Sequence, residues 1–86
     1  IPSDSLILKD MSEIIFKAVK LLPSQQQTVF MLRRFEGRKM SEISEIMGIS
    51  IKTTEMHLSK ALVTLRKSLK EYLPGFLLLL LLKDIL

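Results

Sequence analysis

Side chains that could contact DNA recur along residues 51–69 at the spacing of one helix face. At about 100° per residue, this face carries Lys52, Met56, Ser59, Lys60, Val63 and Lys67, with Glu55 at its edge. Charged and hydrogen-bonding groups on an exposed helix face can contact phosphates and base edges in a major groove. An ordinary amphipathic helix whose polar face is merely solvated would show the same pattern. The opposite face is apolar and is expected to be core: Thr54, Leu58, Ala61, Leu62, Leu65 and Leu69, with Ile51 at its near end.

A short amphipathic segment and a tight turn precede this helix. We expect an inward face of Ile43, Ile46 and Met47, which fall at helical spacing. Gly48 can end the segment in the left-handed conformation, with Ile49 supplying an apolar contact. Ser50 is a candidate N-cap for the next helix because its hydroxyl can accept a backbone hydrogen bond. Two helices joined by such a turn predict a helix-turn-helix, whose second helix reads DNA.

The remainder of the chain predicts two more helices and no strands, giving an all-α, four-helix domain. A cap at Ser3, Asp4 or Ser5 opens a first helix that runs to about Leu21, and its inward stripe is Leu8, Met11, Ile15, Val19 and Leu22. Pro23 ends that helix and opens the second. The second helix carries Val29, Phe30, Leu32 and Phe35 before Gly37 closes it.

Positive charge is concentrated on the helix-turn-helix half of the chain. The net charge is +4 over 86 residues; residues 1–32 are neutral, residues 33–70 carry nine Lys or Arg against four Glu, and residues 71–86 are net negative by one. This distribution favours a polyanionic partner and a salt-dependent affinity. The chain has no cysteine, which excludes disulfides and thiolate metal sites. Without an initiator Met or a signal-like N-terminus, it is expected to be a fragment of a cytoplasmic protein with a second domain upstream.

Several motifs, in order, resemble region four of bacterial RNA polymerase sigma factors of the extracytoplasmic-function type. They are Leu22 to Phe30 (LPSQQQTVF), Arg33 to Gly37 (RRFEG), Ser41 to Glu55 (SEISEIMGISIKTTE), Ser59 to Leu62 (SKAL) and Leu65-Arg66. The resemblance covers about Leu21 to Tyr72. It implies a four-helix domain that docks on the beta-subunit flap of the polymerase core, reads the minus-thirty-five promoter element and has an anti-sigma factor as a partner.

The resemblance also implies which residues contact DNA. It places a phosphate contact at Arg33 and base or backbone contacts at Lys52, Thr53, Glu55, Met56, Ser59 and Lys60. The chain departs from the family at Glu55, a position that is often basic, where a carboxylate repels phosphate but can accept from a cytosine amino group. It also departs at Lys39, where the family often has a Ser or Thr cap, so Ser41 is expected to cap the third helix instead.

Two other functional classes fit parts of the sequence. Gly48, Ser50, Thr53 and His57 also match the effector domain of a response-regulator or quorum-sensing type transcription factor. Against that class, the preceding segment is Leu22-Pro23-Ser24, and an apolar tail follows. A helical adaptor that binds protein and not DNA is the third hypothesis. Polymerase binding, palindrome binding as a dimer, or binding insensitive to salt would distinguish the three.

We predict no enzyme, cofactor or metal site. The single histidine, His57, has no second ligand at suitable spacing, and no nucleophile, base and orienting group form a set. The predicted domain covers residues 1–73, with Pro74-Gly75 ending the fourth helix.

Residues 74–86 form an apolar C-terminal extension whose run Phe76–Leu82 is far shorter than the roughly 20 residues of a membrane span. We expect this extension to be helical and covered by its own domain, by a second copy in a homodimer or by another protein partner. Stable membrane insertion is not expected.

Overall fold

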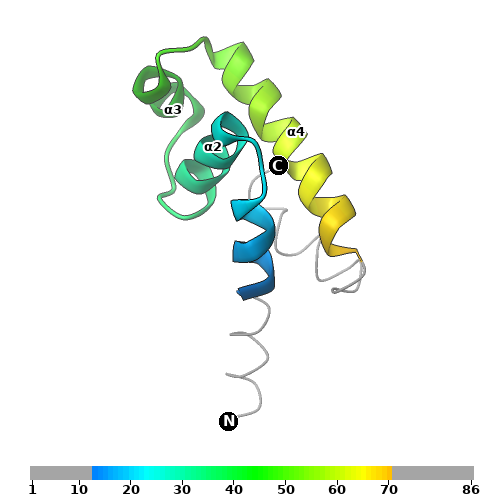
Figure 1. Ribbon diagram of the computed structural model, residues 1–86. Helices are drawn as coiled ribbons and strands as arrows, with labels where there is room; N and C mark the ends of the chain where they lie inside the picture. Colours follow the sequence, from blue (N-terminus) through cyan, green and yellow to red (C-terminus); the bar gives the residue numbers. More distant parts are fainter. Residues whose placement is uncertain (1–12, 71–86) are drawn as a thin grey trace.

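The computed structural model describes residues 13–70, all of whose regular structure is helical (Figure 1). Helical residues 13–20 come first, followed by α2 (Ser24–Arg34), α3 (Met40–Met47) and α4 (Ile51–Leu69). The predicted all-α fold with a helix-turn-helix is therefore confirmed. The predicted N-terminal cap, Leu8, Met11 and the extension 74–86 lie outside the described residues. Within 13–70, no helix is long and apolar enough to cross a membrane.

The core is formed where α4 packs against α2 and α3. All six residues of the predicted apolar face of α4, from Thr54 to Leu69, are buried. Residues of the preceding elements complete the core: Val19, Leu22, Val29, Phe30 and Ile43. Ile51 is 47% exposed, so its predicted place in the core is wrong. It is the first residue of α4, directly after the turn from α3.

Pro23 separates the first two helices as predicted. It is the N-cap of α2, and its carbonyl accepts from the Gln27 amide, so the missing proline N–H breaks no helical bond. The helix ends at Arg34, and Phe35 follows as its C-cap with 56% of its surface exposed. Phe35 therefore lies outside the second helix that was expected to carry it, and its ring stands edge-on to Phe30 with 6.3 Å between centroids.

The inward face of α3 differs from the predicted one by a rotation of the helix. Ile43 is buried and Met47 is half-buried as expected, but Ile46 is 56% exposed and Ser44 is buried instead. The Ser44 hydroxyl donates to the Ser41 carbonyl at 2.7 Å, which satisfies it inside the core. Packing against α4 selects the stripe that contains Ile43, Ser44 and Met47, so Ile46 was wrongly assigned.

The capping of α3 also corrects the sequence prediction. Lys39 is the N-cap residue, and Ser41 lies inside the first turn. A lysine ammonium has no acceptor for the free amides, but the Glu42 carboxylate accepts from the Lys39 amide at 3.0 Å. This contact is the half of a capping box that a lysine permits.

The fourth helix is shorter than predicted. It ends at Leu69 with Lys70 as its C-cap, before Pro74-Gly75 is reached. Leu69, the last residue of α4, is buried and belongs to the core.

Candidate nucleic-acid interface

The turn between α3 and α4 fixes the direction of the candidate recognition helix. Gly48 adopts φ +68° and ψ +34°, the left-handed conformation predicted for it. Its amide donates to Glu45, and the Ile49 amide donates to the Ser44 carbonyl at 3.1 Å, a pair of bonds typical of a Schellman ending. Ser50 then caps α4, because its Oγ accepts from the Thr53 amide at 3.0 Å. Both predicted signals of the turn are confirmed.

Five of the seven predicted contact residues share the outward face of α4. Lys52, Glu55, Met56, Ser59 and Lys60 are all exposed, at spacings of three, four, seven and eight residues from the first. From Lys52 to Lys60 this face extends about 12 Å along the helix, close to the width of a B-DNA major groove. The face can thus present two ammonium groups, a hydroxyl, a carboxylate and a thioether to one groove.

Thr53, a sixth predicted contact, is held in the helix cap. It is half-buried, and its Oγ1 accepts from the Ser50 hydroxyl at 2.9 Å while its amide donates back to Ser50. It lies about 100° around the helix from Lys52. Its hydroxyl proton remains available for a partner, but its first role in this structure is to orient the start of α4.

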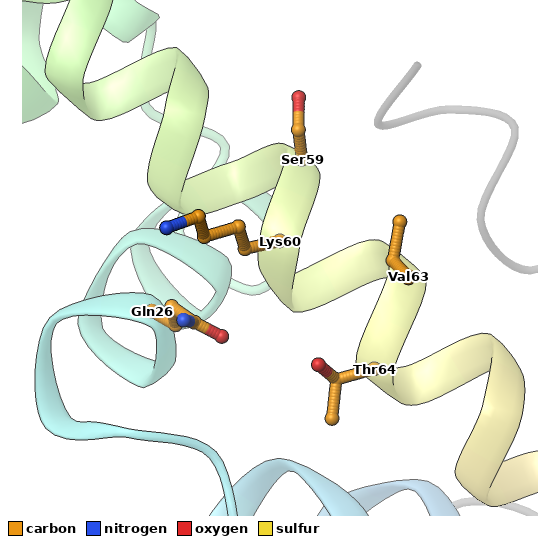
Figure 2. Close-up of a pocket in the computed structure, with 5 residues that line it drawn as sticks. All are labelled: Gln26, Ser59, Lys60, Val63 and Thr64. Atoms are coloured by element: carbon orange, nitrogen blue, oxygen red, sulfur yellow. The ribbon is translucent and has the colours of Figure 1, made fainter.

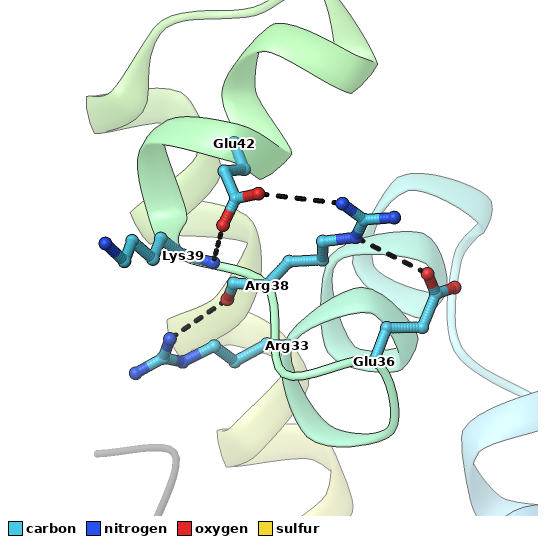
Figure 3. A network of polar contacts seen from close by, with 5 residues as sticks. All are labelled: Arg33, Glu36, Arg38, Lys39 and Glu42. Carbon is cyan, nitrogen blue, oxygen red and sulfur yellow. Dashed lines mark hydrogen bonds and ion pairs between the residues drawn. The ribbon is translucent and has the colours of Figure 1, made fainter.

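Arg33, the seventh predicted contact, lies on α2 beside the loop that leads to α3. Its Nη1 donates to the Arg38 carbonyl at 3.0 Å (Figure 3). Within residues 13–70, no hydrogen bond or ion pair joins Arg33 to the contact residues of α4. The structure therefore divides the predicted set into a face on α4 and a separate basic position near the α2–α3 loop.

A polar network holds that loop in place and adds two basic residues to the site. Arg38 bridges Glu36 and Glu42, with both N–O distances at 3.6 Å, and Glu42 also accepts from the Lys39 amide (Figure 3). These ion pairs are exposed and weak singly, but they share one guanidinium. In Figure 3 the Lys39 amine and the Arg33 guanidinium project to the same side.

Arg38 and Lys39 are not among the predicted contact residues, although basic pairs on either side of Phe35-Glu36-Gly37 indicate the place in the sequence. Their positions now define a basic loop, consisting of Arg33, Arg38 and Lys39. The backbone bond from Lys39, with the nearby Arg38 charge, lowers the pKa of Glu42 below its usual value. Glu42 therefore stays ionised and keeps Arg38 directed along the loop and away from Arg33.

Residues 13–70 contain no group of three or more metal-ligating side chains. His57 of α4 is half-buried, and its Nδ1 is buried without a hydrogen-bond partner among the described residues. The chemistry of the described surface is therefore that of ammonium, guanidinium, hydroxyl and carboxylate groups. Such groups bind by charge and hydrogen bonding, and the basic loop can contact phosphates while the outward face of α4 contacts bases.

Comparison with known proteins is consistent with this geometry. The model of the family "Sigma-70, region 4" matches residues 12–65, which include α2, α3 and residues 51–65 of α4. The ECF RNA polymerase sigma factor SigW of Bacillus subtilis (strain 168) is 27% identical over 71 residues, covering 83% of this chain and 38% of the relative. The chain thus spans less than half the length of that relative. No solved structure matches the chain.

The family match favours the sigma-factor hypothesis over the response-regulator effector and the helical adaptor. It covers the Leu22-Pro23-Ser24 segment, the Gly48 turn and the buried stripe of α4 as far as Leu65 together. These are also the elements that build the exposed face and the basic loop. The chain belongs to the sigma-70 region 4 family, and its motifs are those of the extracytoplasmic-function type.

Proposed function

We propose that this domain recognises promoter DNA at the minus-thirty-five element as part of a sigma factor that directs RNA polymerase to initiate transcription. The outward face of α4 enters the major groove. Lys52, Glu55 and Met56 lie nearest the helix N-terminus and contact base edges, while Ser59 and Lys60 contact the flanking backbone. Thr53 contributes through its free hydroxyl proton.

The observation that carries this proposal is the exposed face of α4 behind a rigid turn. Five polar or adaptable side chains remain in solvent on one face, although the opposite face is fully buried. The Gly48 ending and the Ser50 cap fix the angle of that face relative to α3. The basic loop adds phosphate contacts from Arg33 and Lys39, which position the domain without reading sequence, while Arg38 orders the loop through Glu36 and Glu42.

Glu55 gives the proposed interface its specificity. A carboxylate on the groove face is unfavourable near phosphate, and it gains only where a base donates a hydrogen bond, as the cytosine amino group does. Glu55 is exposed and lies one turn beyond the helix start. We therefore infer that Glu55 lies over a base whose amino group donates in the major groove, a cytosine or an adenine.

Family membership supports further partners for the complete protein. We propose that the domain docks on the beta-subunit flap of the RNA polymerase core, and that an anti-sigma factor binds the complete protein. With these partners, the complete protein is expected to act in the cytoplasm, where promoter DNA and polymerase are. The domain acts without a cofactor, because its proposed role is binding and not a reaction.

The proposal is tested in two steps. Promoter sequences are first selected with the intact protein bound to core polymerase. The affinity of the 86-residue chain for the selected element is then measured at several salt concentrations. Lys60→Ala and Lys39→Ala should each weaken binding to all sequences and lower the salt slope by about one. Lys17→Ala removes an equal charge from the exposed first helical segment and serves as the matched control with an unchanged slope.

Glu55→Gln separates base reading from charge. It removes a repulsive carboxylate, so affinity for unrelated DNA should rise, while preference for the base pair under position 55 should change. Circular dichroism verifies that each variant keeps its helices. Equal affinities and salt slopes for wild type, Lys60→Ala and Lys39→Ala would exclude the proposed interface.

A further inference from the structure

An open apolar groove lies on α4 directly beside the proposed DNA contacts. It has a volume of about 310 Å³ and is lined by Gln26 of α2 and by Ser59, Lys60, Val63 and Thr64 of α4 (Figure 2). Most of its wall is apolar, and Val63 is 52% exposed. The volume is at the small end of ligand sites, which are about 300–1,000 Å³. It suits a few aliphatic side chains better than a cofactor.

The polar part of the groove lacks a partner. Figure 2 shows the Gln26 side chain directed at α4, between Lys60 and Thr64. Its Oε1 is buried and accepts no hydrogen bond from any residue that the structure describes. A buried acceptor without a donor costs free energy, about 1–3 kcal/mol in general. A peptide that moves the flexible Lys60 stem aside can supply the missing donor from its backbone.

We propose that the apolar segment Phe76–Leu82 of this same chain docks in the groove and competes with DNA. The segment consists of one Phe and six consecutive Leu, a composition that matches an aliphatic wall. Because Ser59 and Lys60 line the groove and also belong to the proposed DNA interface, an occupied groove blocks one end of that interface. This competition, unlike the docking itself, rests on the proposed function.

The length of chain beyond α4 allows the segment to return. Val63 precedes Lys70, the C-cap of α4, by seven residues, a distance of about 10 Å along the helix. The six residues from Lys70 to Phe76 can extend to about 20 Å, and Pro74-Gly75 favours a change of direction. The segment can therefore reach the groove from its own helix.

Tethering favours this occupant over a second copy. A segment joined to its site by only a few residues has an effective concentration near the millimolar range. A second copy reaches that level only when the protein itself is that concentrated. At micromolar protein, the groove is therefore filled from within the same chain.

Cysteine pairing tests the docking, because the chain has no cysteine of its own. Val63→Cys is combined with Leu77→Cys, Leu79→Cys or Leu81→Cys in the full chain, and mild oxidation at micromolar concentration is followed on a non-reducing gel. A bond requires Cα atoms within about 7 Å. We expect a fast intramolecular disulfide in at least one pair. Ser41→Cys with the same three partners is the control, since Ser41 is exposed on α3 and does not line the groove.

Disulfide-linked dimers as the main product would show that a second copy is the occupant and overturn the proposal. Equal rates for the Val63 and Ser41 pairs, or no disulfide in any Val63 pair, would overturn it as well. These outcomes do not depend on DNA, so they remain decisive even if the proposed function fails.

DNA affinity tests the competition. Leu78→Gln combined with Leu80→Gln should weaken docking and leave all DNA contacts in place. If about nine-tenths of the molecules are docked, the variant should bind the selected promoter element about tenfold more tightly than the wild type. Equal affinity would overturn the competition. Absence of binding by both proteins would instead contradict the proposed function, and the disulfide result would still decide the docking.

Discussion

Replacing Gly48 with alanine should destabilise the domain through backbone conformation alone. Gly48 has φ +68°, and a Cβ built at this position meets no atom within 4 Å. There is therefore no steric clash with neighbours, and the cost is that of a left-handed residue with a side chain, about 1–2 kcal/mol. Alanine also restricts the unfolded chain, which offsets part of this cost. The expected net loss in the free energy of unfolding is about 1 kcal/mol.

Thermal unfolding followed by circular dichroism should reveal this loss. For a domain of this size, about 1 kcal/mol corresponds to a decrease in Tm of about 4–8 °C. Gly48→Asn should lose less, because asparagine tolerates the left-handed region. Gly37→Ala provides a matched control, since Gly37 has φ +65° and equally open surroundings, and it should lose a similar amount. An unchanged Tm in Gly48→Ala, or equal losses for alanine and asparagine, would refute the conformational explanation.

Three further perturbations test other parts of the structure. Leu62→Ala should cost about 2–5 kcal/mol in urea unfolding because Leu62 is buried. Lys67→Ala, at an exposed position of the same helix, should change stability by no more than about 0.5 kcal/mol; equal effects would mean that the buried face is misplaced. Ser50→Ala removes the acceptor of the Thr53 amide and should cost about 1 kcal/mol, while Ser59→Ala should not change the melting curve. The folded-state pKa of Glu42 lies below its ordinary value of 4.5. The stabilising effect of the Glu42 carboxylate should therefore be complete above pH 4.5 and disappear as the pH falls through the folded-state pKa. The urea midpoints of wild type and Glu42→Gln should converge in acid, and a difference that stays constant with pH would contradict this role of Glu42.

Much of the helix-turn-helix follows from local sequence signals. The Gly48 ending, the Ser50 cap and the six-residue buried face of α4 could all be predicted because each depends on backbone geometry or on the helical period within one segment. A 19-residue helix gives many positions that agree on one face. The opposite face of the same helix then holds the exposed positions, which are Lys52, Glu55, Met56, Ser59 and Lys60.

Only the tertiary structure could decide the orientation of short or terminal elements. The eight-residue α3 has few turns, so its apolar pattern fits two neighbouring faces, and contact with α4 buries Ser44 and exposes Ile46. Phe35 and Ile51 lie at helix ends. The apolar periodicity of the sequence extends to these positions, but no neighbouring helix of the described residues packs against them there. Apolar character alone therefore placed them wrongly.

The same distinction applies to the functional surface. The sequence determined which side chains face outward on α4, because helical geometry sets that within one element. It did not determine that Arg33 lies beside Arg38 and Lys39, or that Gln26 faces Lys60 across an apolar groove. Those neighbours are separated along the chain or fixed by a loop, and they meet because the burial of Val29, Phe30 and Leu62 sets how α2 lies against α4.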